Sequence, residues 1–437
     1  MKYYSTNRQT PPVSLAEAVK NGLAPDRGLY MPERIPRLPG EFFDRIADMD
    51  FISMSSVVAR AFFGEDIPAD DIDRIVRDTL SFDTPLVEVE DGIRSLELFH
   101  GPTMAFKDVG GRFMARMLSC FIGDGDTGKV TVLVATSGDT GSAVANGFLG
   151  VEGIDVVVLY PSGKVSEIQE KQFTTLGRNI TAIEVMGTFD DCQRIVKTAF
   201  LDSDLNGKFT LTSANSINVA RFLPQTFYYF NAFAQLKRLG IGDAPVFCVP
   251  SGNFGNLTAG LVAARMGLPV KRFVAANNIN DVFLEYLRTG TYRPRPSVRT
   301  LANAMDVGDP SNFARILDMY GGSVESIRHD IVGCRYTDDD IRRTVRDVYE
   351  RTGYLLDPHG ACAYSGLKDS LCPGETGIFL ETAHPAKFRE TVSGIIGAPV
   401  PVPDNLRKFM SGEKKTVIIG NTFGEFKCYM QSGKCAG

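Results

Sequence analysis

One polar loop lies where a strand is expected to end and a helix to begin. The segment SGNFGN (251–256) follows the apolar run VFCVP (246–250) and precedes a helical stretch. At such a junction, consecutive backbone N–H groups and the positive end of the helix dipole converge on one point. Glycines let the backbone approach a ligand closely, and asparagines tolerate unusual backbone angles. The loop is either a phosphate cradle without a cationic side chain or an ordinary glycine-rich turn.

A second loop occupies the same kind of position between a strand and a helix. The segment ATSGDTGSA (135–143) supplies hydroxyl groups from Ser137, Thr140 and Ser142. Hydroxyls and open backbone N–H groups suit a carboxylate or a phosphate. Asp139 would be an awkward neighbour for an anion, so we expect it to cap the helix instead. This loop, too, has a purely structural interpretation.

A lysine lies in an apolar setting in the segment ELFHGPTMAFKDVGGRF (97–113). Lys107 follows Met104, Ala105 and Phe106, and partial desolvation by such neighbours favours the neutral, nucleophilic form of an amine. The alternative is a surface lysine that extends its charged end into water.

The combination of the three segments favours the chemical interpretation of each. A phosphate cradle, a carboxylate loop and a nucleophilic amine are together what a Schiff-base cofactor with a phosphate tail requires.

The elements that must position these segments alternate along the chain from Val130 onward. Apolar runs rich in β-branched residues are separated by helix-length segments, which indicates βαβ units and parallel sheets covered on both faces. The expected strands are 130–135, 154–160, 179–185, 209–214, 246–250 and 270–277. Two groups of such units predict two parallel-sheet α/β domains with a cleft between them.

The remaining segments differ from this pattern. Residues 1–84 read as helical patches broken by proline-rich stretches, and we expect a mainly helical N-terminal cap. The Pro/Arg segment 291–300 is too long for a tight turn and is a candidate cover for a site. Residues 338–353 form an amphipathic pattern whose charges indicate a solvated helix face.

Composition excludes several classes of protein. The 437 residues are 43% hydrophobic and 23% charged, with a net charge of −5, which is ordinary for a globular protein and argues against a broad nucleic-acid surface. No run approaches the ~20 apolar residues of a membrane span, and the polar start does not resemble a signal peptide. The eight cysteines contain no C-x-x-C pair and the four histidines are isolated, so we expect no metal site, free thiols and a cytoplasmic protein. No cysteine has an evident role.

One segment imitates a nucleotide-binding loop. The sequence GDGDTGK (123–129) has the spacing of a P-loop as far as its lysine, but Val130 replaces the magnesium-binding hydroxyl. It also precedes a strand instead of following one, so we interpret it as a surface turn.

The motifs together resemble the threonine synthase family of pyridoxal 5'-phosphate enzymes, in the tryptophan-synthase-β-like fold group (fold type II). The resemblance covers nearly the whole chain, the N-terminal cap included, up to about residue 400. The matching segments are GLYMPE (28–33), FHGPTMAFKD (99–108), ATSGDTGSA (135–143), YPSGKVSEIQEKQ (160–172), SANSINVAR (213–221), PSGNFGN (250–256), AMDVGDPSNF (304–313) and ETAHPAKF (381–388).

The resemblance implies roles for individual residues. Lys107 matches the Schiff-base lysine, and Thr382 matches the hydroxyl that faces the pyridine nitrogen, which would leave the ring a weaker electron sink than a carboxylate partner would. His100 and His384 are expected to orient loops. The cofactor-phosphate loop is Gly252, Asn253, Phe254, Gly255 and Asn256; the substrate-carboxylate loop is Thr136, Ser137 and Thr140; the candidates for the substrate phosphate are Lys164, Asn215, Asn218 and Arg221.

The resemblance also implies a reaction and a domain division. The substrate would be O-phospho-L-homoserine, converted with water to L-threonine and phosphate by γ-elimination and β-addition, in a monomer or homodimer. The expected domains are a cap (1–84), a large cofactor domain (85–126 and 215–437, with a C-terminal extension) and a small domain (127–214).

Two alternatives remain at this stage. One is a pyridoxal-phosphate lyase or dehydratase that releases 2-oxobutyrate, and the cap and the segment 304–313 argue against it. The other is a non-catalytic cofactor-binding protein, and the joint presence of Lys107, the loop 252–256 and Thr382 argues against that.

Overall fold

The computed structural model describes residues 1–122 and 129–433, and the chain forms two compact units. Unit 1 comprises Met1, Met31–Phe106 and Phe222–Pro401, and unit 2 comprises Lys2–Tyr30, Lys107–Arg221 and Val402–Gly437. Of the segment 123–129 only Lys129 is described, so the predicted surface turn lies outside the described residues, as does Cys435. No helix in the described ranges is long and apolar enough to cross a membrane.

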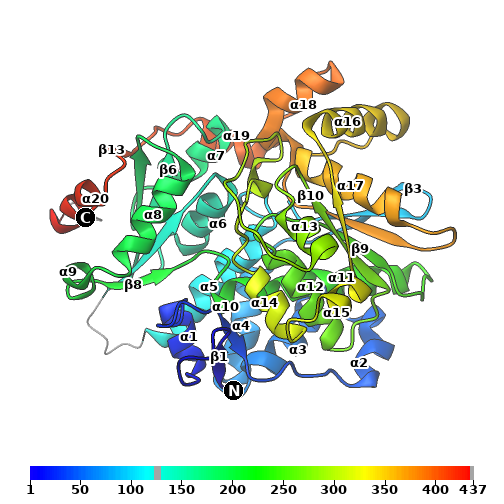
Figure 1. Ribbon diagram of the computed structural model, residues 1–437, viewed down its shortest axis with the longest axis horizontal. Helices are drawn as coiled ribbons and strands as arrows, with labels where there is room; N and C mark the ends of the chain where they lie inside the picture. The colour runs from blue at the N-terminus through cyan, green and yellow to red at the C-terminus, as the bar shows by residue number, and fades with distance from the viewer. Residues whose placement is uncertain (123–128, 434–437) are drawn as a thin grey trace. The chain divides into compact units, whose positions relative to one another are not determined.

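Unit 2 is built on a five-stranded parallel sheet with the strand order β13-β7-β6-β5-β8 (Figure 1). Its strands are β5 (Val130–Ala135), β6 (Ile154–Pro161), β7 (Ile180–Val185), β8 (Thr210–Ser213) and β13 (Val417–Ile419). Its helices are α1 (Leu15–Asn21), α5 (Lys107–Phe121), α6 (Asp139–Phe148), α7 (Glu167–Thr174), α8 (Phe189–Ala199), α9 (Ser203–Asn206), α19 (Asp404–Met410) and α20 (Phe423–Gln431), and β1 (Tyr3–Ser5) also belongs to it. Every residue of β5 is buried, as expected for an apolar strand covered on both faces.

Unit 1 is built on a six-stranded sheet with the order β11-β10-β9-β12-β4-β3, parallel except for the antiparallel pair β3–β4 (Figure 1). Its strands are β3 (Leu86–Glu90), β4 (Ile93–Glu97), β9 (Val246–Pro250), β10 (Arg272–Asn277), β11 (Ile331–Arg335) and β12 (Gly377–Glu381). All six strands predicted from the sequence are present in one unit or the other.

Most helices of unit 1 cover this sheet or form the N-terminal region. They are α2 (Gly40–Arg45), η1 (Ile46–Asp48), α3 (Phe51–Phe63), α4 (Ala69–Thr79), η2 (Leu223–Gln225), α11 (Thr226–Arg238), α12 (Gly255–Arg265), α13 (Val282–Thr289), η3 (Asn303–Met305), α14 (Phe313–Met319), α15 (Val324–Asp330), α16 (Asp338–Thr352), α17 (Pro358–Ser370), η4 (Pro385–Phe388) and α18 (Arg389–Ile396). β2 (Tyr30–Pro32) and α10 (Val219–Phe222) cross the borders between the units. Residues 291–300 contain no helix or strand, as predicted.

The compact units differ from the expected domain borders at both ends of the chain. Residues 2–30 belong to unit 2, whereas the rest of the expected cap belongs to unit 1. The C-terminal segment was expected to extend the large domain, but β13 pairs in parallel with β7. Ile419, Phe426 and Met430 complete an apolar core with Ile183 and Ile195 of unit 2. This burial accounts for the difference, and a three-residue strand carries too weak a pattern to reveal it.

Glycines bring α5 and α6 into close contact within unit 2. A Cβ atom on Gly111 would lie 2.7 Å from the carbonyl oxygen of Ala143, and one on Gly147 would lie 2.8 Å from the carbonyl carbon of Gly111. The backbones of the two helices therefore touch where other residues would hold them apart. Because Lys107 is the first residue of α5, this contact helps to fix the helix that carries it.

The helix contact predicts opposite effects for two glycine-to-alanine substitutions. Gly111→Ala should destabilise the protein by about 1–3 kcal/mol, because the new methyl group meets backbone atoms that cannot move aside cheaply. Gly394→Ala is the matched control: it also lies within a helix, α18, but its Cβ would meet nothing within 4 Å. That substitution should stabilise by about 0.5–1 kcal/mol through helix propensity. Urea unfolding measures both, and equal effects would contradict the contact.

Candidate active site

The residues before Lys107 form a short backbone ladder with the segment after β12. The N–H of Phe106 donates to the carbonyl of Thr382 at 2.8 Å, and the N–H of His384 donates to the carbonyl of Met104 at 3.1 Å. Met104 adopts a left-handed φ of 55°, which is uncommon for a residue with a side chain. The ladder therefore places Phe106, the residue that precedes Lys107, beside Thr382, which lies 276 positions later in the chain. We call Met104–Phe106 the pre-lysine segment.

Two side chains that sequence reasoning missed also hold this stretch. The ammonium group of Lys387 is buried, with the residue 1% exposed, and donates to the carbonyl of Thr103 at 2.9 Å. The hydroxyl of Tyr228 donates to the carbonyl of Phe106. Buried donors to backbone carbonyls keep a loop in one conformation. The lysine in ETAHPAKF was visible in the sequence, but nothing there distinguished it from a surface lysine.

The loop 251–256 has the geometry of an anion site. Phe254 precedes α12 in the left-handed conformation, with φ of 61°, and α12 begins at Gly255 and runs for 11 residues. Within the described ranges, the backbone N–H groups of Gly252, Phe254, Gly255 and Asn256 have no hydrogen-bond acceptor. Unpaired N–H groups at the start of a helix are suited to an anion such as a phosphate. The residues present therefore fit a cofactor phosphate at this position.

The asparagines of this loop hold its shape. Asn253 accepts a hydrogen bond from the N–H of Ser311 at 2.6 Å, and its carbonyl accepts one from the side chain of Asn312 at 2.9 Å. The amide of Asn256 donates to the carbonyl of Pro250 at 2.9 Å. Their side chains thus bind the protein, which leaves the backbone N–H groups to face a ligand.

Gly252 lies so close to another segment of the protein that a side chain would not fit. A Cβ atom there would lie 2.6 Å from the carbonyl oxygen of Ala304 and 3.0 Å from the Cα of Met305. The segment 304–313 therefore packs directly against the loop, both here and through Ser311 and Asn312.

Thr382 follows β12 and is 6% exposed. It is flanked by Glu381, which is fully buried, and by Ala383, whose N–H donates to the carboxylate of Asp357 at 3.2 Å. Asp357 and His359 are also buried, and sequence reasoning missed all three polar residues. The only signal in the sequence was an Asp-Pro-His-Gly stretch, a pattern that is typical of an ordinary helix start.

In unit 2, the loop 135–143 uses its hydroxyl groups in two ways. Thr136 is 1% exposed, and its hydroxyl accepts the N–H groups of Gly138 at 2.9 Å and Gly141 at 2.8 Å. Thr136 therefore shapes the loop. Ser137 and Thr140 are partly exposed at the start of α6 and are available to a ligand.

The expectation that Asp139 caps the following helix is wrong. Gly138 occupies the N-cap position of α6 and Asp139 is the first helical residue. Its carboxylate accepts a hydrogen bond from the amide of Gln169 at 2.8 Å. The loop turns with a φ of 139° at Gly138, a conformation that favours glycine and moves the cap one residue earlier.

The four candidates for the substrate phosphate have different environments within unit 2. Lys164 is exposed, and Asn215 is partly buried with a side-chain oxygen that lacks a donor in the described part of the chain. Asn218 is fully buried and donates to the carbonyls of Val19 at 2.8 Å and Ser213 at 3.2 Å. These two hydrogen bonds give the Asn218 side chain a structural role. Arg221 is 1% exposed and donates to the carbonyl of Ala214. As phosphate ligands, all four stay predictions.

His100 and His384 pack around Phe99, at ring distances of 4.8 and 5.2 Å. His100 contacts the carboxylate of Glu97 at 2.8 Å, and His384 accepts the N–H of Ala386 at 3.0 Å. Burial, with a smaller contribution from His100, lowers the pKa of His384 to about 4.

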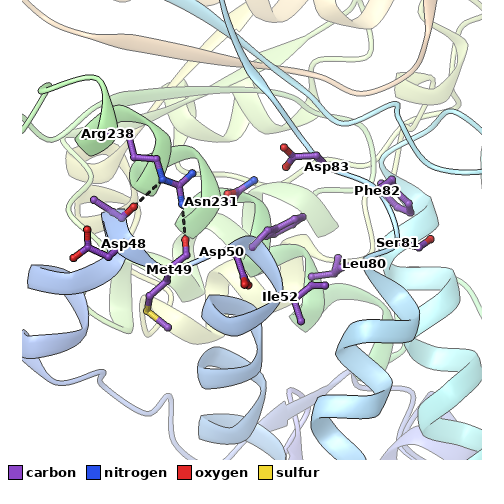
Figure 2. Close-up of a pocket in the computed structure, with 12 residues that line it drawn as sticks. Asp48, Met49, Asp50, Ile52, Leu80, Ser81, Phe82, Asp83, Asn231 and Arg238 are labelled. Carbon is purple, nitrogen blue, oxygen red and sulfur yellow. Dashed lines mark hydrogen bonds between the residues drawn. The ribbon is translucent and has the colours of Figure 1, made fainter.

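A groove of about 720 Å³ elsewhere in unit 1 is lined by residues 47–52 and 80–83 together with Asn231 and Arg238 (Figure 2). None of the predicted site residues lines it. Its charged groups serve the fold: the carboxylate of Asp50 caps α3, and Arg238 donates to the carbonyls of Ala47 and Met49. No group of three or more His, Cys, Asp or Glu in the described ranges could hold a metal ion.

The lowered pKa of His384 predicts a pH-dependent contribution to stability. The folded-state pKa of about 4 lies below the ordinary value of 6.5, so the neutral form is favoured in the folded protein. The contribution is fully present above pH ~6.5 and is lost as the pH falls through ~4, up to about 3 kcal/mol in all. His384→Asn should retain an acceptor for the N–H of Ala386 without titrating. Urea unfolding at pH 7 and pH 4.5 should show a smaller acid loss in this variant, and an equal loss would refute the assignment.

Comparisons with known proteins cover the chain from end to end. Family models described as "Threonine synthase N terminus", "Pyridoxal-phosphate dependent enzyme" and "Threonine synthase, C-terminal" match residues 2–80, 82–379 and 360–429. The threonine synthase of Haemophilus influenzae is 44% identical over 433 residues, which are 98% of this chain and 99% of the relative.

Solved structures agree with the sequence comparisons. The crystal structure of threonine synthase from Escherichia coli matches with a TM-score of 0.93 and 42% identity over 99% of this chain and 100% of that chain. A pyridoxal-phosphate-bound threonine synthase from Brucella melitensis matches with a TM-score of 0.92 and 34% identity over 99% of each chain. Maize serine racemase, at 14% identity and a TM-score of 0.54, shares the fold. These matches confirm the predicted fold class and cofactor, and the chain belongs to the threonine synthase family of pyridoxal-phosphate-dependent enzymes.

Proposed function

We propose that this protein converts O-phospho-L-homoserine and water into L-threonine and phosphate. The observation that carries the proposal is the arrangement around Lys107. The pre-lysine segment is paired with Thr382, and the same unit presents N–H groups at the start of α12 that have no acceptor among the described residues. An amine, a hydroxyl and an anion site are the three contacts that pyridoxal phosphate needs.

Lys107 would bind the cofactor's aldehyde carbon, the N–H groups of the loop 252–256 would hold its phosphate, and the hydroxyl of Thr382 would face its ring nitrogen. Bound in this way, the cofactor supplies a conjugated ring that takes up electrons from bonds broken at the substrate's Cα and Cβ. Because Thr382 is neutral, the protein places no carboxylate directly on that nitrogen.

Lys107 also has a role in proton transfer. When it is not bonded to the cofactor, its ε-amine would remove protons at Cα and Cβ of the substrate and deliver one to Cγ after the γ-phosphate leaves. The hydroxyl of water then adds at Cβ, and a proton returns to Cα. The atoms balance, since one water enters and one phosphate departs.

The substrate would be held by unit 2. Ser137 and Thr140 offer partly exposed hydroxyls at the N-terminus of α6, where the helix dipole favours a carboxylate. Thr136 contributes by shaping the loop, as its two accepted hydrogen bonds indicate. For the substrate phosphate, Lys164 and Arg221 would supply positive charge, and Asn215 a side-chain oxygen, without a donor among the described residues, that could order water beside it. Asn218 would act indirectly, by holding its loop to α1.

The rival functions differ in their products. A lyase that releases 2-oxobutyrate would use the same cofactor contacts but would not add water at Cβ. A non-catalytic protein would bind the cofactor and form no product. The identity of 34–46% with threonine synthases, over nearly the full chain, supports hydration over both rivals.

We also propose a cytoplasmic location, no membrane or nucleic-acid partner, and a monomer or homodimer. The net charge of −5 and the absence of disulfides among the described cysteines support this setting.

Lys107→Ala should abolish threonine formation and the absorption band of the lysine-linked cofactor, because no other group can replace the amine as both attachment point and base. The circular dichroism spectrum should be unchanged. Lys197→Ala, which removes an exposed lysine on α8, is the control and should leave activity intact. Threonine formation by the Lys107 variant would sink the assignment.

Thr140→Ala and Ser137→Ala should raise KM for O-phospho-L-homoserine, each by about tenfold, because each removes a hydrogen bond to a charged group. Thr136→Ser keeps the loop-shaping hydroxyl and should change KM little. Steady-state kinetics distinguishes the variants, and an unchanged KM in both alanine variants would exclude this loop from substrate binding.

A further inference from the structure

A buried polar cluster in unit 1 connects the two segments that would hold the cofactor. It consists of Asp357, His359 and Glu381, and we call it the Asp357 cluster. Asp357 is fully buried at the N-cap of α17, where its carboxylate accepts the N–H of His359 at 2.5 Å, that of Gly360 at 3.4 Å and that of Ala383 at 3.2 Å. Three backbone N–H groups therefore fix the position of this carboxyl group.

The imidazole of His359 links Asp357 to a second segment. Its Nδ1 lies 2.6 Å from the carboxylate of Asp357, and its Nε2 accepts the N–H of Ala304 at 3.2 Å. Because Nε2 accepts, the ring proton is on Nδ1, which donates to Asp357. The ring is 2% exposed, so both hydrogen bonds are shielded from water.

Glu381 completes the cluster as a neutral acid. Its Oε1 accepts the N–H of Asp357 at 2.6 Å, while its Oε2 has no donor in the described ranges. Burial, reinforced by the charge of Asp357, raises the pKa of Glu381 well above its ordinary value. Protonation removes the charge from this carboxyl group and so lowers the cost of leaving Oε2 without a donor. A Cβ atom on Gly360 would lie 1.5 Å from Oε2, so only glycine leaves room for this carboxyl group.

The two outer contacts of the cluster are made with the cofactor segments. Ala383, which donates to Asp357, directly follows Thr382. Ala304, which donates to His359, has its carbonyl oxygen 2.6 Å from where a Cβ on Gly252 would lie. One chain of contacts therefore runs from Thr382 through Asp357, His359 and Ala304 to the loop 252–256.

We propose that Asp357 and His359 are positioning residues that hold Thr382 and the loop 252–256 in fixed register, so that the cofactor's ring nitrogen and phosphate meet preformed partners. This inference rests on the proposed function. The cluster touches the backbone on either side of the cofactor contacts and acts through it. Its hydrogen bonds are buried and connect with one another, and such a network can transmit a fixed geometry between loops.

Two substitutions of His359 test the two ends of this chain of contacts one at a time. His359→Asn keeps a donor near Asp357 but removes the acceptor for the N–H of Ala304. His359→Gln keeps that acceptor but removes the donor to Asp357. The apoenzyme of each is titrated with pyridoxal phosphate and, separately, with pyridoxal, which lacks the phosphate; the absorption maximum of each complex is recorded.

The two variants should differ in which affinity they lose. His359→Asn should lower the affinity for pyridoxal phosphate by about tenfold or more and the affinity for pyridoxal much less, because the lost contact supports the phosphate loop. His359→Gln should lower the affinity for both compounds and shift the absorption maximum, because Asp357 loses its contact with residue 359 and no longer holds the segment of Thr382 in place. Asp50→Asn, at the N-cap of α3, is the matched control, since both helices have 13 residues and an aspartate cap. It should leave both affinities unchanged. Wild-type affinities and spectra in both His359 variants would overturn the proposal.

Glu381 supplies a second test that does not depend on the folding of the His359 variants. Glu381→Gln keeps a side-chain oxygen that can accept the N–H of Asp357 and should retain wild-type cofactor affinity, whereas Glu381→Leu loses this acceptor and should weaken cofactor binding. Equal affinities in the two variants would contradict the proposal. If the wild-type protein itself fails to bind pyridoxal phosphate or to form threonine, the proposed function fails; if it does both while the variants match it, only this inference fails.

Discussion

The site depends on the backbone ladder between Met104–Phe106 and Thr382–His384. The three proposed cofactor contacts come from positions 107, 252–256 and 382, and no local pattern in the chain could bring them together. The ladder joins the first to the third, because Lys107 follows Phe106 directly and Phe106 is bonded to Thr382. The Asp357 cluster would join the third to the second. A site of this kind forms at the carboxyl ends of parallel strands, where the loops that follow the strands lie at one edge of the sheet.

Several polar side chains near the proposed site hold the shape of its loops. Thr136, Asn253, Asn256 and Asn218 all bind the protein itself, and each looked like a ligand-binding residue in the sequence. What they leave for a ligand is backbone N–H groups at helix starts. Such donors need no side-chain ordering on binding, so the anion meets a preformed site.

The strands of both units could be predicted because runs such as VTVLVA and VFCVP are buried on both faces and carry a strong apolar signal. The motifs around Lys107 and Gly252 could be predicted from residue types and from the family resemblance. The sequence did not predict which unit each end of the chain joins, because β13 has three residues and its place depends on tertiary packing. The Asp357 cluster was missed for a related reason: buried polar residues follow no periodic pattern, and Glu381 becomes notable only beside Gly360. Asp139 was misassigned because the backbone conformation of Gly138 sets the cap.

The central claim is that Lys107, Thr382 and the two loops carry out elimination of phosphate followed by hydration at Cβ. The most direct test mixes the purified, cofactor-loaded protein with O-phospho-L-homoserine and quantifies every product. We expect threonine and phosphate in equal amounts. Phosphate with 2-oxobutyrate in place of threonine would contradict the hydration step and make the protein a lyase, and no product from protein that holds the cofactor would contradict the substrate assignment.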